Sequence, residues 1–137
     1  MTSIRQLKDQ KRTVLEGMAD SKNAISNMED KVSRLQGASS NLATSISEVE
    51  ILKSSISDLK VDSRRWKGKE KKNFEDAYSS YKESMKNYFS RTEEAKDAID
   101  EDIKRYEAKI DTYTIGLNNL EITLDVLNKQ INQAQKE

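Results

Sequence analysis

Apolar residues recur along most of this chain in steps that alternate between three and four residues, the spacing of a coiled-coil seam. In the first half the pattern keeps a single phase from Ile4 to Ile56. The polar residues that occupy seam positions in this half are Lys11, Ser21, Ser39 and Lys53. The pattern predicts one long amphipathic helix. Residues 36–41 are poor helix formers, so a bend or a short loop there is the alternative to a continuous helix.

The second half carries a similar seam from Phe74 to Ala134. We place its first positions at Phe74, Tyr78, Tyr81, Met85, Tyr88, Thr92, Ala95 and Ile99. From Ile103 onward every seam position is apolar. A change of phase near Ile99 to Ile103 predicts a stutter, which is a local unwinding of the supercoil.

The two halves meet at a segment that ends the first seam and contains Gly68, a residue suited to a turn. We therefore divide the chain into a first arm at residues 2–62, a turn at 63–69 and a second arm at 70–136. Proline is absent and glycine is rare, so little interrupts either arm. Because the arms are nearly equal in length, the sequence predicts an all-α fold, a single elongated antiparallel helical hairpin over residues 1–137.

Charged residues make up 35% of the chain and hydrophobic residues only 34%, which suits an apolar stripe along a rod better than a round core. Further apolar residues widen this stripe beyond one seam, and they are Leu15, Ile51, Leu52, Leu59, Phe89, Ile115 and Ile122. Such width favours a bundle completed by another helical protein or by a second copy. The alternative is a free-standing coiled-coil spacer. The seam residues expected to bind a partner are Leu35, Leu42, Ile46, Val49, Ile103, Tyr106, Ile110, Tyr113, Leu117, Leu120, Leu124 and Leu127.

Composition argues against catalysis. Cysteine and histidine are both absent, which excludes thiolate chemistry and histidine-based metal or general-base sites. Carboxylate pairs are expected on solvated helix surfaces, where their pKa values stay ordinary. We therefore expect no enzyme activity, no catalytic residues, no cofactor and no metal. The N-terminus lacks the apolar region of a Sec signal peptide, and no segment is apolar enough to cross a bilayer, so we expect a cytoplasmic protein.

Trp66-Lys67-Gly68 lies between the two arms and contains the only tryptophan of the chain. A small helical protein with such a turn at its midpoint resembles the WXG-motif (ESAT-6-like) family of type VII secretion substrates. Over the whole chain the resemblance is one of architecture, and residue by residue it rests on Trp66 and Gly68. The arms are longer than is typical of that family, which makes the chain more similar to the helical accessory proteins associated with LXG-domain toxins. The alternative role for Trp66 is a structural staple between helix ends.

The resemblance implies a non-enzymatic partner that binds the helical domain of an LXG-type toxin and supports its type VII secretion. On this view the chain is itself a candidate for secretion. Self-association or a generic spacer role is the alternative. The family also carries an export signal, an aromatic residue followed four residues later by an acidic one, and Phe89 with Glu93 fits a phenylalanine version. The pair would share one exposed helical edge. The alternative is a packed phenylalanine beside a solvated glutamate.

The expected turn is also basic, through Arg64, Arg65, Lys67 and Lys69. Basic residues around a tryptophan can contact phosphate and stack on a base, or they can meet an acidic partner or an anionic membrane. Formal net charge is zero, with 24 basic and 24 acidic residues, so the chain as a whole has no electrostatic footprint for nucleic acid. We therefore disfavour a nucleic-acid partner.

Overall fold

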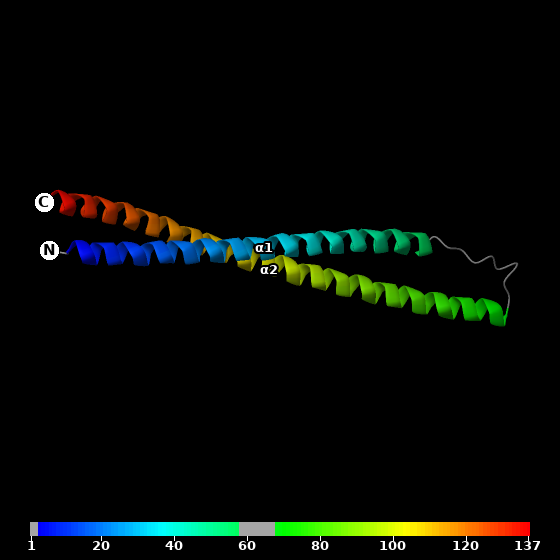
Figure 1. Cartoon of the computed structure of the whole chain (residues 1–137). Coiled ribbons are helices and arrows are strands. Elements are labelled where there is room, and N and C mark those ends of the chain that lie inside the picture. Colours follow the sequence, from blue (N-terminus) through cyan, green and yellow to red (C-terminus); the bar gives the residue numbers. More distant parts are fainter. Residues whose placement is uncertain (1–2, 58–67) are drawn as a thin grey trace. The chain divides into compact units, whose positions relative to one another are not determined.

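The protein is an all-α helical hairpin, as the seams predicted. The structure, a computed structural model, describes residues 3–57 and 68–137, and it contains the helices α1 (Ile4–Ser57) and α2 (Lys69–Lys136) (Figure 1). Helix α1 continues through residues 36–41, so the predicted continuous helix is confirmed at that point. The predicted end of the first arm at residue 62 and most of the predicted turn lie outside the described residues.

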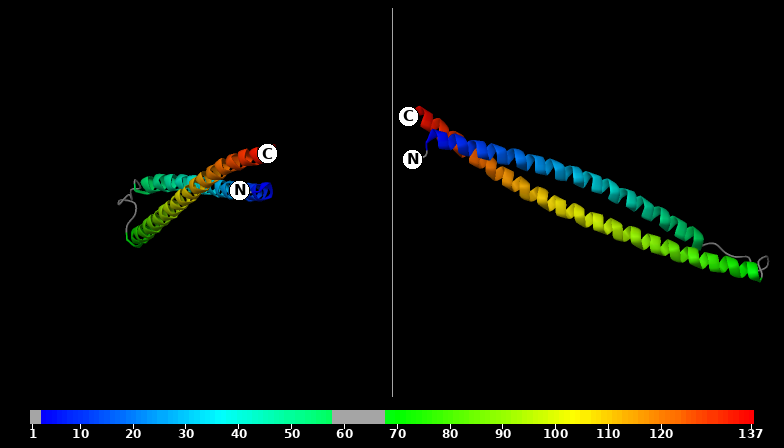
Figure 2. Two further views of the ribbon diagram at one scale, coloured as in Figure 1. Left: turned by 90° about the vertical axis from the view of Figure 1, so that its left-hand side faces the viewer. Right: turned by 60° about the horizontal axis from the view of Figure 1, so that its bottom comes forward.

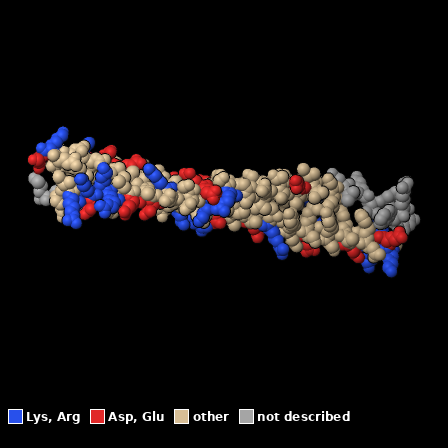
Figure 3. Space-filling view, in the orientation of Figure 1, with Lys and Arg blue, Asp and Glu red and all other residues tan. Residues whose placement is uncertain are grey.

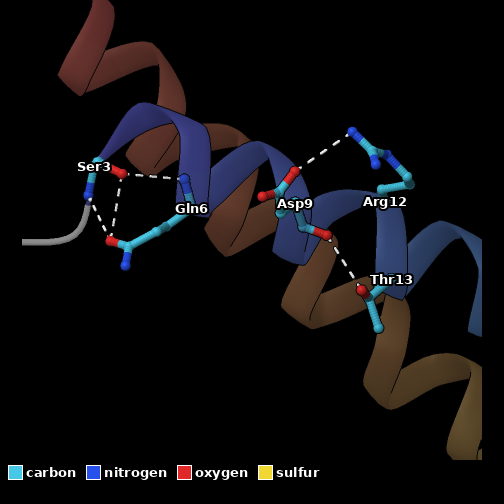
Figure 4. Close-up of polar contacts among 5 residues, drawn as sticks. All are labelled: Ser3, Gln6, Asp9, Arg12 and Thr13. Carbon is cyan, nitrogen blue, oxygen red and sulfur yellow. Dashed lines mark hydrogen bonds and ion pairs between the residues drawn. The ribbon is translucent and has the colours of Figure 1, made fainter.

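Helix α1 begins with a capping box formed by Ser3 and Gln6 (Figure 4). The Gln6 backbone N–H donates to Ser3 Oγ at 3.2 Å, and the Ser3 backbone N–H donates to Gln6 Oε1 at 3.1 Å. Each side chain thus satisfies a backbone donor that has no partner within the helix. The same view shows Arg12 pairing with Asp9 at 3.4 Å, an exposed ion pair that adds little stability.

Helix α2 is preceded by Gly68, whose φ of 72° lies in the left-handed region. This conformation is costly for residues that carry a Cβ atom, so glycine is the favoured residue there. The Lys72 N–H donates to the Gly68 carbonyl at 3.2 Å and closes the first turn. Glu70 in the first turn and Lys136 in the last turn have the signs that favour the helix dipole.

The chain forms two compact units, each built from one segment of α1 and one segment of α2. In the first unit, residues 4–34 pack against residues 102–136, and both chain ends lie at the same end of the unit (Figures 1 and 2). Its core consists of Leu7, Val14, Leu127 and Ile131, with Met18, Leu120, Leu124 and Ala134 packed against it. The two segments approach closely at Gly17, because a Cβ atom there would lie 3.3 Å from Leu120 Cδ1.

The second unit pairs residues 35–57 of α1 with residues 69–101 of α2. Val49 and Thr92 are buried in it. The Thr92 hydroxyl donates to the Tyr88 carbonyl of its own helix at 2.8 Å. Because the hydroxyl keeps a hydrogen-bond partner, its burial carries little desolvation penalty. Across the unit, the Tyr78 hydroxyl donates to the Ile56 carbonyl near the end of α1.

The predicted phase of the second arm is wrong between Met85 and Ile99. Tyr88 is 55% exposed and Ala95 is exposed, whereas their neighbours Phe89 and Lys96 are half-buried. The packed positions in this stretch are Met85, Phe89, Thr92, Lys96 and Ile99. From Phe89 to Ile103 the packed residues therefore follow regular steps of three and four, with no stutter at Ile99 to Ile103. The extra step of four lies between Met85 and Phe89, so the stutter is located there.

Electrostatic contacts explain this shift. The Lys53 ammonium of α1 lies 6.0 Å from the centre of the Phe89 ring, so Phe89 gains a cation–π contact as well as packing. Lys96 donates to Asp100 Oδ2 at 2.7 Å, so its charge keeps a partner on the half-buried side. Tyr88, in contrast, can direct its hydroxyl to water.

Candidate functional site

The predicted partner-binding seam is the internal contact of the hairpin. All of its residues except Tyr113 are half-buried or buried, and they are Leu35, Leu42, Ile46, Val49, Ile103, Tyr106, Ile110, Leu117, Leu120, Leu124 and Leu127. The surface available to a partner is therefore made by the large apolar residues that remain exposed. These are Leu15, Ile51, Leu52, Tyr81, Tyr88, Tyr113, Ile115, Ile122 and Val126.

One of these residues, Tyr81, lines a hollow in the second unit. The hollow has a volume of about 320 Å³ and is lined by Ile56, Phe74, Ala77, Tyr78 and Tyr81. Phe74 and Tyr78 stack within it, with ring centres 5.9 Å apart. It is therefore an apolar groove with contributions from both helices.

Two exposed residues extend this groove along the helices. Tyr88 lies two helical turns beyond Tyr81, and Leu52 lies one turn before Ile56, so each continues the side on which its neighbour lies. Tyr81, Tyr88 and Leu52 are each at least half exposed. We call this surface the aromatic flank, and it comprises Leu52, Ile56, Phe74, Ala77, Tyr78, Tyr81 and Tyr88.

The other side of the same helix contact is basic. A second hollow, of about 220 Å³, is lined by Lys53, Ile56, Lys82, Met85 and Lys86. Tyr81 and Lys82 are consecutive and so point about 100° apart, which places them on opposite sides of the packed line between Tyr78 and Met85. The second unit therefore presents one aromatic side and one basic side.

Charge is sparse on the α1 segment of this unit. Between residues 35 and 57 the charged residues are Glu48, Glu50 and Lys53, and the remainder are apolar, small or uncharged polar residues. Figure 3 shows the result, because side chains other than Lys, Arg, Asp and Glu cover most of the visible face over this part of the chain. A partner that packs there needs to desolvate few charges.

A polar layer crosses the helix contact of the second unit at Ser39. The Ser39 hydroxyl, although buried, donates to Asp100 Oδ1 at 2.6 Å, and Lys96 pairs with Oδ2 of the same carboxylate. The hydrogen bond to Asp100 raises the pKa of the Lys96 ammonium, and the charges of Asp100 and Asp97 add to this effect. Partial burial of Lys96 opposes it. The layer satisfies its own polar groups and links α1 to α2.

The two residues of the candidate export signal differ in their exposure to solvent. Phe89 is half-buried against Lys53, whereas Glu93 is exposed. This arrangement fits the alternative interpretation, a packed phenylalanine beside a solvated glutamate. Their role in export stays a prediction.

Most of the predicted turn motif cannot be placed. Trp66 and Lys67 lie outside the described residues, as do Arg64 and Arg65. Gly68 precedes α2 and Lys69 begins it, and both are exposed. The WXG-type turn and the basic tip thus stay predictions.

Two other kinds of feature were considered in the part of the chain that the structure describes, a metal centre and a membrane span. Within residues 3–57 and 68–137, no three acidic side chains lie close enough together to hold a metal ion. Over the same residues, neither helix contains a stretch apolar enough to cross a bilayer.

Comparison with protein families identifies relatives of the hairpin. The model of the YwqH-like family matches residues 9–133, which include most of both helices. The chain belongs to the YwqH-like family. No curated protein and no solved structure matches this YwqH-like chain. The family match supports the resemblance to helical accessory proteins, whereas membership of the WXG-motif family stays a prediction.

Proposed function

We propose that this YwqH-like chain is a non-enzymatic accessory protein that binds the helical domain of an LXG-type toxin and supports its type VII secretion. Family membership supports the proposal, because YwqH-like proteins are helical proteins associated with LXG toxins. The hairpin fold supports it as well, since a two-helix hairpin can accept further helices to complete a bundle.

The aromatic flank is the observation that carries the proposal. Tyr81, Tyr88 and Leu52 leave large apolar surfaces in water beside a groove between two helices. A third helix laid along the groove would remove these surfaces from water, at a gain of about 1.5–3 kcal/mol for each fully buried side chain. Docking of an amphipathic helix into an apolar groove is a common mode of recognition.

Two neighbouring residues of α1 provide a matched test of this surface. Leu52 belongs to the aromatic flank and is 50% exposed, while Ile51 points about 100° away and is 67% exposed. Neither side chain is needed for the core of the hairpin. Leu52→Lys and Ile51→Lys therefore add the same charge at similar cost to folding but on different sides of the helix.

The experiment is co-expression of each variant with the N-terminal domain of an LXG-type toxin from the same organism, followed by affinity capture and measurement of Kd. We expect the wild type and Ile51→Lys to bind alike, and Leu52→Lys or Tyr88→Lys to weaken binding by about tenfold or more. Export of the toxin should fall in parallel. Equal binding by all variants, or no capture of the LXG domain by the wild type, would refute the proposed function.

A further inference from the structure

Helix α2 carries a second line of residues with alternating steps of four and three, on the side away from α1. Its members, which we call the outer stripe, are Ala108, Thr112, Ile115, Asn119, Ile122 and Val126. All of them are exposed, and Ile115 and Ile122 are each more than 60% exposed. The packed line of the same segment runs from Ile110 through Leu117 and Leu124. Each member of the outer stripe is two residues from Ile110, Leu117 or Leu124, so at about 100° per residue it lies about 160° around the helix from that line.

Two threonine hydroxyls on or beside this face form hydrogen bonds with the backbone of their own helix. The Thr112 hydroxyl donates to the Ala108 carbonyl at 3.1 Å, and the Thr123 hydroxyl, at the edge of the stripe, donates to the Asn119 carbonyl at 3.0 Å. With their hydroxyls directed to the backbone, both threonines present methyl groups to the outside. The face is thus more apolar than its sequence indicates.

Acidic residues outnumber basic ones along this segment. Between residues 108 and 126, the extent of the outer stripe, the basic residue is Lys109 and the acidic residues are the three side chains Asp111, Glu121 and Asp125. None of the three forms an ion pair with another part of the chain that the structure describes. Asp111 and Asp125 lie along one edge of the outer stripe, while Thr112, Asn119 and Thr123 form an uncharged opposite edge.

We propose that the outer stripe is a second helix-docking surface, separate from the aromatic flank, and that its partner is an amphipathic helix of another protein whose aliphatic stripe is bordered by lysine or arginine. The alternating steps match the seam of a packed helix. The unpaired acidic edge attracts basic residues and repels acidic ones. Both observations are independent of the proposed toxin partner.

The same charges argue against two other occupants. A second copy that packed its own outer stripe here would bring acidic edges together, and on residues 4–34 the only large exposed apolar side chain is Leu15. An anionic membrane would be repelled, because helices that lie on membranes border their apolar face with Lys and Arg. A basic-edged protein helix is the remaining match for both the shape and the charge.

The test uses the full chain and two synthetic helical peptides as probes. Both peptides carry leucine in alternating steps of three and four, and they differ in having lysine or glutamate beside the leucines. Fluorescence anisotropy should show that the wild type binds the lysine peptide about tenfold or more tightly than the glutamate peptide at low salt, with a smaller difference at high salt. Asp111→Lys together with Asp125→Lys should reverse this preference.

Matched variants locate the binding surface. Ile122→Lys should lower the affinity for the lysine peptide by about tenfold or more, whereas Ile51→Lys and Leu52→Lys should change this affinity by no more than about twofold. Ile122 and Ile51 have nearly equal exposure, at 63% and 67%, so the two variants are comparable in their effect on folding. Circular dichroism would verify that each variant keeps its helix content.

Several outcomes would overturn the proposal. They are the absence of peptide binding, equal affinity for the two peptides, and equal effects of Ile122→Lys and Ile51→Lys. Sedimentation that shows dimers of the wild type, lost in Ile122→Lys, would assign the surface to a second copy. Binding to anionic vesicles that is lost in the same variant would assign it to a membrane. Because none of these measurements uses the toxin domain, their outcome is separate from that of the proposed function.

Discussion

Lys96 is a charged residue on the packed side of a helix, and Asp100 makes its position tolerable. The carboxylate accepts from Lys96 at 2.7 Å and from the buried Ser39 hydroxyl at 2.6 Å. One side chain thereby satisfies a donor on each helix. Such a layer contributes specificity to a coiled-coil contact, because other alignments of the helices leave these groups without partners.

The raised pKa of Lys96 predicts a pH effect with a definite sign. A lysine whose pKa is higher in the folded chain than in the unfolded chain stabilises the fold below its ordinary pKa of 10.5, and this contribution is lost as the pH rises through the folded value. Thermal melting should therefore show Lys96→Met to be less stable than the wild type at neutral pH. The difference should narrow when the pH is raised above 10.5.

An exposed lysine provides the control for this measurement. Lys104→Met should differ little from the wild type at either pH, because no ion pair holds Lys104 in the described structure. If the deficit of Lys96→Met were the same at both pH values, the contact with Asp100 would not be its source.

At the scale of the element, the two helices differ in how well their sequences specify them. The seam of α1 keeps one phase, so its packed residues could be predicted, and all except Lys53 are half-buried or buried. In α2 the sequence offers two adjacent candidates at Tyr88 and Phe89, and again at Ala95 and Lys96. Hydrophobicity alone favours Ala95 over Lys96. The contacts with Lys53 and Asp100 decide the phase, and these depend on the folded arrangement.

The interaction surfaces were predicted only in part. The sequence predicts that Ile51, Leu52, Ile115 and Ile122 widen the packed stripe. Leu52 does flank it, whereas Ile51, Ile115 and Ile122 lie on the far side of their helices and are exposed, so the prediction is wrong for these three. Val126 was missed, as was the exposure of Tyr81 and Tyr88, because these tyrosines fitted the assumed seam. The hydroxyl contacts that make the outer stripe more apolar follow from side-chain rotamers, which no spacing rule gives.

Three glycines within the helices give a graded prediction about helix stability. A Cβ atom at Gly37 or Gly116 would meet nothing within 4 Å, whereas at Gly17 it would lie 3.3 Å from Leu120 Cδ1. Gly37→Ala and Gly116→Ala should each raise the free energy of unfolding by about 0.5–1 kcal/mol. Gly17→Ala should raise the free energy of unfolding by less than the other two substitutions, or should lower it, because the Leu120 side chain has to move. Urea denaturation would measure the series, and an equal gain at all three sites would contradict the close approach at Gly17.

At the scale of the whole molecule, stability and recognition use different side chains. Leu127 is 5% exposed in the core of the first unit, while Ile122 on the same helix is exposed. The protein can therefore lose apolar surface at Ile122 with little effect on folding, and this separation makes surface variants informative about partners.

Truncation of these two residues should show the separation directly. Leu127→Ala should lower the free energy of unfolding by about 2–4 kcal/mol, because it removes buried methyl groups and leaves a cavity. Ile122→Ala should change it by less than about 0.5 kcal/mol. Chemical denaturation followed by circular dichroism would measure both. A large loss from Ile122→Ala would mean that the outer stripe is already covered in the free protein.

Both ends of the chain lie at the same end of the first unit, next to the layer that contains Leu7 and Ile131 (Figures 1 and 2). Force applied to the two ends would therefore peel the segments of that unit apart one layer at a time, as a zipper opens, instead of shearing many layers together. In that geometry the force at any moment is opposed by the packing of one layer and not by all layers together. Mechanically, the first unit is a structure that yields to a small, steady pull from its ends.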